Sequence, residues 1–255
     1  MSPDERVRKH FNNNVDEYSI RYLDGYQQVC GRRMRQIERL CDSRAVNLIL
    51  DVGCGAGVFS DLLLARFPNA AIVCLDCSRE MLRANKTSGR KRLLQADCVR
   101  LPFQSRTFDL VNIDTVMHHL VCDDGYKATV SRIRDFLGEV VWVLRPSGLV
   151  AFREIYHESL FFETLHSRAL YEITIRKVPQ PLAKTMRRAG IQTTNVGVCF
   201  LSRPQWRDLV ASLPLRPVLV EDSAWRGPGI CYYRALGFRA NGDLDYYLET
   251  RRQGN

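Results

Sequence analysis

The sequence lacks a long apolar run. None of its apolar stretches reaches the roughly 18 residues that a membrane-spanning helix needs. The chain begins with MSPDER, which is polar and charged where a signal peptide requires an apolar segment. These absences predict neither a membrane span nor secretion, and we expect a cytoplasmic protein.

The cysteines lack a pattern typical of disulfides or of a metal site. There are nine of them, an odd number, and they are scattered along the chain. The single CxxC pair, Cys74 and Cys77, falls at the end of an expected strand, whereas a thioredoxin-like pair would open a helix. No second CxxC pair and no histidine pair at ligand spacing completes a zinc site. We therefore expect reduced thiols and no metal.

Charge is plentiful, and it is mostly positive. The net charge of +9 favours anionic partners, such as nucleic acid, anionic lipid or a phosphorylated or carboxylated small molecule. Residues 168–207 hold eight Lys or Arg and one acid, Glu172. Because the sequence has no appended RNA-binding module and no RNP-like aromatic motif, nucleic acid is the less favoured partner.

A single α/β domain accounts for the pattern of the chain. With 255 residues and 45% hydrophobic content, it is long enough for one large core but too short for two ordinary enzyme domains. Apolar runs of strand length alternate with helical segments, which favours a Rossmann-like, seven-stranded, mostly parallel sheet with helices on both faces. The expected strands are 45–52, 70–76, 92–97, 108–114, 149–155, 217–224 and 246–250. The expected helices between them are 59–67, 79–88, 126–144 and 204–213.

A glycine-rich turn follows the first expected strand. The segment LDVGCGAG places glycines at 53, 55 and 57 between a strand-like run and a helix. Such a turn lets the backbone approach a ligand closely, and the helix directs free N–H groups toward it. The turn alone does not identify the cofactor, since the dinucleotide fingerprint GxGxxG uses the same physics.

Three carboxylates at strand ends help to distinguish between the possible cofactors. Asp51 would oppose a pyrophosphate but suits a ligand with an α-amino group and a positively charged sulfur. Asp76, 21 residues after Gly55, is placed to accept hydrogen bonds from ribose hydroxyls, as it would in an NAD site. Asp97 has no counterpart in the dinucleotide pattern and suits an adenine amino group. An ordinary capping role stays open for each Asp alone, but the set favours a sulfonium cofactor.

The chain resembles the class I S-adenosylmethionine-dependent methyltransferases, especially the group similar to ubiquinone/menaquinone C-methyltransferases. The resemblance runs from about residue 47 to residue 155 through four blocks, LDVGCGAG, LDCSREML, QADCVRLPF and LRPSGL. It implies methyl transfer from S-adenosyl-L-methionine, with S-adenosyl-L-homocysteine as the product, in small-molecule biosynthesis. The parts that we expect are N-terminal helices covering the cofactor site (1–44), the cofactor-binding core (45–155), an inserted helical substrate cap (156–200), and the last helix and strands (201–255). A turn at Asn241-Gly242 is expected before the last strand.

The resemblance also implies roles for single residues at the methionine end of the cofactor. Gly53 and Gly55 would contact the methionine part, and Asp114 would border it. Tyr18 or Arg21 would help to hold the cofactor carboxylate, with helix packing and solvent exposure as the alternative for this pair.

At the nucleoside end, the resemblance implies that Asp76 binds the ribose and that Met81 packs on the adenine face. Asp97 and the backbone of Cys98 would hold the adenine edge. The complete predicted cofactor-binding set is Tyr18, Arg21, Asp51, Gly53, Cys54, Gly55, Asp76, Cys77, Met81, Asp97, Cys98 and Asp114.

Two histidines follow the fourth expected strand, near the point where the methyl group should emerge. His118 or His119 would act as a general base if the acceptor needs deprotonation, and shaping the pocket is the alternative. The same region has IDTV in place of the Asn/Asp-Pro-Pro-Tyr typical of amide or adenine nitrogen methylation. Cys122 follows Val121 rather than Pro or Thr, which disfavours pyrimidine C5 methylation.

The acceptor is expected under the basic, aromatic segment after the fifth strand. The predicted cap residues are Phe161, Phe162, Tyr171, Arg187 and Arg188. A solvated basic face stays open for any single Arg, but the cluster favours a small-molecule acceptor that is anionic or lipid-like and has an apolar body. A structured-RNA methyltransferase and a non-catalytic binding protein of the same fold remain alternatives. The sequence leaves the methylated atom and the oligomeric state open.

Overall fold

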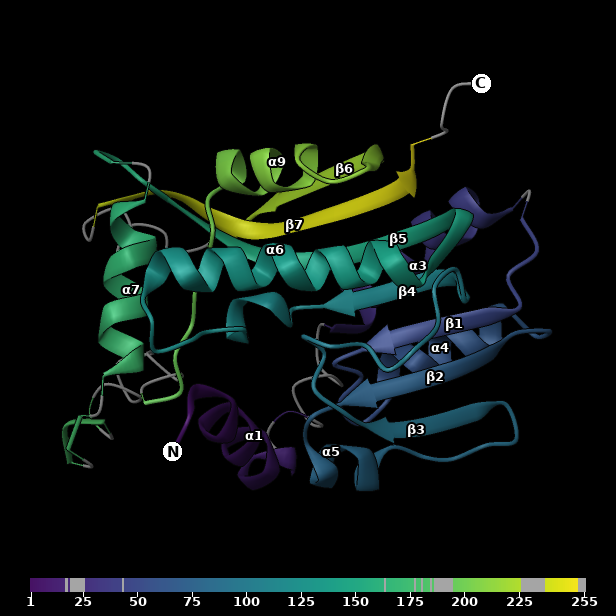
Figure 1. Cartoon of the computed structure of the whole chain (residues 1–255), viewed down its shortest axis with the longest axis horizontal. Coiled ribbons are helices and arrows are strands. Elements are labelled where there is room, and N and C mark those ends of the chain that lie inside the picture. Colours follow the sequence, from purple (N-terminus) through teal and green to yellow (C-terminus); the bar gives the residue numbers. More distant parts are fainter. Residues whose placement is uncertain are drawn as a thin grey trace.

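The computed structural model describes residues 1–16, 18, 26–42, 44–162, 164–176, 178–179, 181–183, 185, 195–225 and 237–251. These residues form one seven-stranded sheet with helices packed on it (Figure 1). The strands are β1 (Leu48–Val52), β2 (Ala71–Asp76), β3 (Lys91–Gln95), β4 (Phe108–Asp114), β5 (Leu144–Ser159), β6 (Leu215–Ala224) and β7 (Phe238–Thr250). The helices are α1 (Pro3–Asn13), α3 (Tyr26–Cys41), α4 (Val58–Arg66), α5 (Arg79–Ala84), α6 (Tyr126–Val143), α7 (Leu165–Ile175) and α9 (Arg203–Ala211), with a short 3-10 turn, η1 (Met117–His119).

The order of the strands in the sheet is β3-β2-β1-β4-β5-β7-β6. Strands β1 to β5 pair in parallel, and β7 runs antiparallel to both of its neighbours. The predicted Rossmann-like, mostly parallel fold is therefore confirmed. Strand order reverses between β1 and β4, and in such sheets ligands bind outside the carboxyl ends of the strands at this point.

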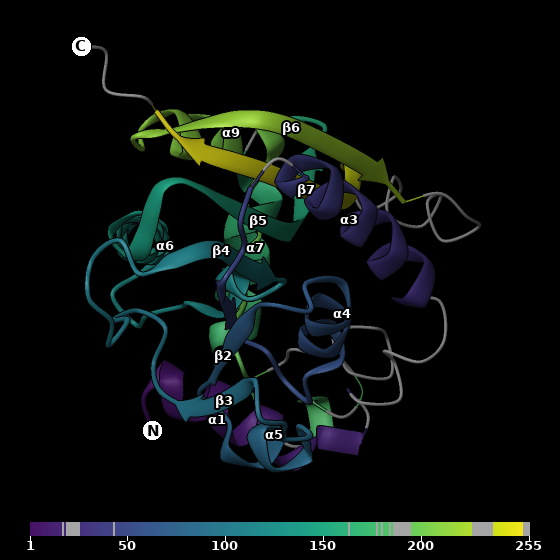
Figure 2. The same cartoon turned by 90° about the vertical axis from the view of Figure 1, so that its right-hand side faces the viewer.

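Alternating strand residues build one core on each face of the sheet. Leu50 and Val111 pack in the core that contains residues of α6 and α9, whereas their neighbours Ile49 and Leu110 pack with α3 and α4. Successive side chains of a strand point to opposite faces, so a strand covered on both faces is apolar throughout. Figure 2 shows α6 on one side of the sheet and α3 and α4 on the other.

The predicted turn at Asn241-Gly242 is wrong. Both residues lie inside β7, where Gly242 pairs with Tyr156 of β5 and with Ala224 of β6. A Cβ atom at Gly242 would lie 2.4 Å from the carbonyl oxygen of Ser223. This glycine therefore permits the close approach of two strands, a role that the sequence does not distinguish from a turn.

Strands β5 and β7 are also longer than predicted. They pair with each other from residue 149 to residue 159 of β5. Polar residues in β5, including Arg153, Glu154 and His157, interrupt the apolar pattern from which a strand is predicted. Two of these polar side chains reach toward the candidate site described below.

Helix α1 lies across the carboxyl ends of the first strands. It begins with a capping box between Ser2 and Glu5 and ends at Asn13. In Figures 1 and 2 it runs beside α5 at the edge of the sheet that carries β3. The hydroxyl of Ser78, which caps α5, donates to the Asn12 side chain at 2.6 Å. This bond ties α1 to the strand ends.

Candidate active site

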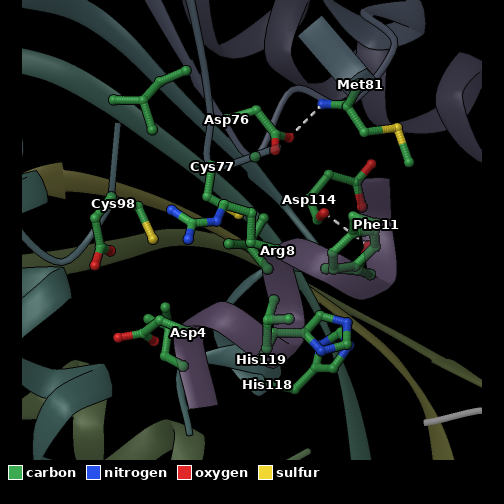
Figure 3. Close-up of a pocket in the computed structure, with 18 of the residues that line it drawn as sticks. Asp4, Arg8, Phe11, Asp76, Cys77, Met81, Cys98, Asp114, His118 and His119 are labelled. Carbon is green, nitrogen blue, oxygen red and sulfur yellow. Dashed lines mark hydrogen bonds between the residues drawn. The ribbon is translucent and has the colours of Figure 1, made fainter. Parts of the chain in front are cut away.

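A cavity of about 530 Å³ opens at the carboxyl ends of β1, β2 and β4. Figure 3 shows that residues of α1 face the strand ends across this cavity. The predicted residues that line it are Tyr18, Gly53, Gly55, Asp76, Cys77, Met81, Asp97, Cys98, Asp114, His118 and His119. Lining residues that sequence reasoning did not single out for the site include Asp4, Val7, Arg8, Phe11, Gln95, Thr115, Val116, Ile155 and Phe200.

The glycine turn leaves room for a ligand at one end of the cavity. Gly53 has a φ of 67°, and a Cβ there would lie 2.3 Å from a methyl group of Val116. Gly55 has a φ of 52°, and a Cβ there would meet no atom within 4 Å although the residue lines the cavity. The backbone N–H groups of Gly53 and Cys54 donate to the Leu75 carbonyl at 2.7 and 3.1 Å, which joins the turn to β2.

Asp76 is held in place at the end of β2. Its carboxylate accepts hydrogen bonds from the backbone N–H groups of Gly55 at 2.9 Å and Ser78 at 2.8 Å. Burial raises the pKa of Asp76, and these hydrogen bonds oppose the rise. The carboxylate lines the cavity with lone pairs still available for hydroxyl donors.

Asp51 and Cys54 lie behind the turn. They line a second, small hollow of about 20 Å³ rather than the main cavity. Both carboxylate oxygens of Asp51 have partners, the Ser60 hydroxyl and the Asn112 amide, the latter at 2.6 Å. Burial raises the pKa of Asp51 to about 6. The side chain thus supports the turn and β4 from within the protein.

A further part of the cavity wall follows β2 and β3 and consists of Cys77, Met81, Asp97 and Cys98. Asp97 is 57% exposed and accepts a hydrogen bond from the N–H of Val99 at 3.0 Å. Burial raises the pKa of the Cys77 thiol to about 12 and also raises the pKa of Cys98. Neither thiol is a thiolate at neutral pH, so neither is a nucleophile.

Asp114 is the only one of these carboxylates in the described residues that forms close ion pairs with buried arginines. Arg33 of α3 and Arg153 of β5 approach it at 3.2 and 2.8 Å. Arg33 also donates to the carbonyl groups of Ile113 and Ala151 at 3.1 and 2.7 Å. Because paired charges stabilise each other in a buried setting, Asp114 presents a fixed carboxylate to the cavity.

The opposite end of the cavity is apolar apart from two histidines. Val116, Leu120, Ile155 and Phe200 line it together with His118 and His119. The rings pack against one another. The distances between ring centroids are 4.1 Å for His118 and His119, 5.0 Å for His118 and Phe200, and 5.1 Å for His119 and Phe11. This end can hold an apolar group beside two imidazoles.

Helix α1 contributes one face to the cavity. Asp4, Val7, Arg8 and Phe11 recur at helical spacing, and that periodicity is the signal that could have identified them. Tyr18 lines the cavity too, with its hydroxyl 2.9 Å from the His10 ring.

Several predicted residues do not line the cavity. Phe161 and Phe162, just after the end of β5, are 77% and 71% exposed, and neither belongs to the lining. Tyr171 is buried, and its hydroxyl donates to the carbonyl of Cys122 at 2.7 Å. Arg21, Arg187 and Arg188 lie outside the described residues.

In the part of the chain that the structure describes, no cluster of His, Cys, Asp and Glu is arranged to hold a metal ion. None of its helices is long and apolar enough to cross a membrane.

The doubly wound sheet, the glycine turn and the carboxylate at the end of β2 define a nucleotide-cofactor-binding α/β protein. Comparison with known proteins identifies which kind. Residues 50–152 match the family described as "Methyltransferase domain". A malonyl-[acyl-carrier protein] O-methyltransferase of Geobacter sulfurreducens is 31% identical over 85% of this chain and 72% of that protein. The chain belongs to the class I S-adenosylmethionine-dependent methyltransferases.

Other relatives match shorter segments. A malonyl-[acyl-carrier protein] O-methyltransferase of Legionella pneumophila is 34% identical over 46% of this chain, a match that spans only 42% of that protein. A demethylmenaquinone methyltransferase of Lactococcus lactis is 28% identical over 62% of this chain and 61% of that protein.

Solved structures share the fold. The N-methyltransferase NodS of Bradyrhizobium japonicum, in complex with S-adenosyl-L-homocysteine, superposes with a TM-score of 0.59 at 14% identity, covering 95% of this chain and all of that chain. A methyltransferase of Leishmania major gives a TM-score of 0.62 at 15% identity, covering 97% of this chain and 83% of that chain. At such identities the likeness shows the fold alone.

S-adenosyl-L-methionine is the cofactor of this enzyme, and the residues present fit it. The open space over Gly55 admits a ligand against the backbone. Asp76 lines the cavity with a carboxylate that can accept hydrogen bonds from hydroxyl donors, and Asp114 borders the same cavity.

Proposed function

We propose that this enzyme methylates a small molecule with an apolar body and an anionic group. The observation that carries this proposal is the contrast within one cavity, which has glycines and carboxylates at one end and apolar side chains with two histidines at the other. Binding pockets lined by apolar residues with a few polar groups suit small organic ligands. A structured RNA would need a broad basic surface instead.

The anionic group is supported by charge and by the relatives. Residues 168–207 carry eight basic residues and one acid. One relative is named malonyl-[acyl-carrier protein] O-methyltransferase and another demethylmenaquinone methyltransferase. The first name gives an acidic acceptor and the second a quinone-type acceptor. The cap residues Phe161, Phe162, Tyr171, Arg187 and Arg188 are part of this proposal as the segment that receives the acceptor.

Within the cavity, each cofactor contact is part of the same proposal. Gly53 and Gly55 would take the methionine part. Asp76 would take the ribose, because its carboxylate lines the cavity and backbone N–H groups hold both of its oxygens. Asp114 would face the charged methionine end. Met81, Cys98 and the exposed Asp97 would surround the adenine, with Tyr18 or Arg21 at the cofactor carboxylate.

The chain's own task in this reaction is placement. S-adenosyl-L-methionine, when bound, supplies a methyl group that is already activated by a positively charged sulfur. The strand ends would hold one reactant and the apolar end the other, and α1 lines one face of the cavity. Holding two reactants in line lowers the barrier without a dedicated nucleophile.

Calorimetry with S-adenosyl-L-homocysteine tests the proposal first. We expect saturable binding and a raised melting temperature, while NAD has no effect. Labelled methyl transfer to malonyl-coenzyme A and to 1,4-dihydroxynaphthalene then tests the acceptor. Binding of total RNA that exceeds binding of both probes, with steep loss in salt, would contradict a small-molecule acceptor.

A further inference from the structure

Glu154 of β5 is a buried carboxylate beside the acceptor end of the cavity. It is fully buried, and each of its oxygens accepts one hydrogen bond. The backbone N–H of Met117 donates to Oε1 at 2.5 Å, and Nδ1 of His118 lies 2.8 Å from Oε2. Among the described residues no Lys or Arg forms an ion pair with it. His118 is therefore its one cationic partner when that ring is protonated.

This pair fixes the orientation of the His118 ring. A carboxylate that accepts from Nδ1 holds the proton of a neutral imidazole on that nitrogen and leaves the lone pair on Nε2. In the described part of the chain no protein group is bonded to Nε2, and the ring lines the cavity. Phe200 stacks on the ring with 26° between planes and prevents it from turning.

His119 is built differently although it is the next residue. It has no carboxylate partner, and its Nδ1 has no hydrogen-bond partner in the described residues. Burial lowers its pKa well below the ordinary value, the neighbouring histidines His118 and His10 lower it further, and only a backbone hydrogen bond with Gly197 opposes this. His119 is therefore held in its neutral form, and in the described residues no carboxylate is bonded to its ring to stabilise an imidazolium.

We propose that His118 is the general base of this methyltransferase, that Glu154 is the residue that positions it, and that the methylated group of the acceptor is a hydroxyl. The inference rests on the proposed function and sharpens it, because it names the reacting group. A carboxylate acceptor has already lost its proton and would need no such base. A hydroxyl on an apolar body needs one at neutral pH.

The step balances within the site. The hydroxyl proton passes to Nε2 of His118, and Glu154 stabilises the resulting imidazolium through Nδ1–H. The acceptor oxygen forms the new bond to the methyl carbon, while the methyl–sulfur bond breaks and its electron pair stays with sulfur. The proton on His118 then passes to water.

Nitrogen-15 NMR of the imidazoles tests the positioning role without any acceptor. In the wild-type protein at pH 7.5 we expect the neutral His118 ring to carry its proton on Nδ1. In Glu154→Gln the amide has one oxygen and one N–H₂ group, so it cannot accept from both Met117 N–H and His118 Nδ1–H. We therefore expect the His118 ring to lose its preference for the tautomer with the proton on Nδ1. A wild-type ring protonated on Nε2 would overturn the role of Glu154.

Transfer assays with the two probes test the reacting group. We expect His118→Asn to lower kcat for 1,4-dihydroxynaphthalene by about 100-fold or more, and Glu154→Gln to lower it by about 10-fold or more. The KM should change little, and added imidazole should restore part of the activity of His118→Ala. Transfer to malonyl-coenzyme A that proceeds equally well in His118→Asn would overturn the hydroxyl assignment.

Two controls separate this inference from the proposed function. His118→Asn and Glu154→Gln should bind S-adenosyl-L-homocysteine with affinities within about threefold of the wild type. If the wild-type protein itself fails to bind it, the proposed function is contradicted and not this inference. His157→Phe removes a histidine that packs edge-on against Phe200, with ring centroids 4.7 Å apart, but does not line the cavity. It should leave kcat and the preference of His118 for a proton on Nδ1 unchanged.

Discussion

The two ends of the cavity are built in different ways. Most of the cofactor end comes from residues 53–98, where glycines and carboxylates follow directly on β1, β2 and β3, and Asp114 at the end of β4 adds to it. The acceptor end brings together Phe11, His119, Ile155 and Phe200, which are far apart in the sequence. One end is therefore fixed by local backbone geometry, and the other by tertiary packing. This difference explains why the cofactor is readily assigned and the acceptor is not.

The largest expected effect concerns the cofactor end. Asp76→Ala removes a carboxylate that also organises the N–H groups of Gly55 and Ser78. Loss of two charge-assisted hydrogen bonds to a ligand should weaken S-adenosyl-L-homocysteine binding by about 100- to 1,000-fold. Calorimetry measures this, and Asp135→Ala, an exposed acid on α6, is the matched control. Equal affinities in both variants would show that the ribose is held elsewhere.

The second prediction concerns the glycine turn. Gly57 has a φ of 82°, and a Cβ there would lie 2.1 Å from the Oδ1 atom of the buried Asn85. Asn85 cannot move freely because it accepts a hydrogen bond from Lys91 at 2.9 Å. Gly57→Ala should therefore lower the free energy of unfolding by about 3 kcal/mol, measured by urea denaturation.

Gly138 provides the matched control for that change. It lies inside α6, and a Cβ there would meet no atom within 4 Å. Gly138→Ala should raise the free energy of unfolding by about 0.5 to 1 kcal/mol, because alanine favours the helix. If both substitutions had the same sign, local backbone geometry would not be what fixes the cofactor end.

The contrast between the ends also sets how much could be predicted from the sequence. The parallel core, Gly53, Gly55 and Asp76 follow from short patterns, since a strand, a turn and a helix in succession place them together. The sequence does not predict that the Asp51 side chain turns away from the cavity, because the residues that bind it, Ser60 and Asn112, lie on other elements. The same holds for Arg33, whose partners lie on β4 and β5.

Glu154 is the clearest omission. It stands in the run VAFREIY, where a charged residue inside a buried strand was a signal available in the sequence. What the sequence could not give is its partner, because His118 is 36 positions away. The cavity-lining role of Phe200 was equally hidden, since this residue follows a segment without a regular apolar pattern.

The third prediction uses the opposite titration of two buried groups outside the cavity lining, His157, which packs against Phe200, and Asp51, which lies behind the glycine turn. Burial, then His118 and His166, lower the pKa of His157 from 6.5 to about 4. A depressed histidine keeps the folded state neutral, so the stability that it contributes is present above pH 6.5 and is lost as pH falls toward 4. The full change is worth about 3 kcal/mol. Asp51, with its pKa raised to about 6, runs in the other direction.

The variant His157→Phe isolates the titration of this histidine, because it leaves Asp51 in place. It should lose less stability than the wild type between pH 6.5 and pH 4, by about 2 to 3 kcal/mol at the lower limit. Urea denaturation at several pH values measures the difference. Parallel stability curves for the two proteins would mean that His157 is not desolvated in solution.

The smallest expected effect concerns α1, which touches both ends. Phe11 contacts His119 edge-on at 5.1 Å and the Tyr18 ring at 4.9 Å. Such aromatic contacts contribute about 0.5 to 1.5 kcal/mol, so Phe11→Leu should weaken S-adenosyl-L-homocysteine binding by about threefold to tenfold by loosening the cover over the cavity. Lys9→Ala, on the exposed side of α1, should have no effect. Unchanged cofactor affinity in Phe11→Leu, together with a higher KM for the acceptor, would assign α1 to the acceptor end alone.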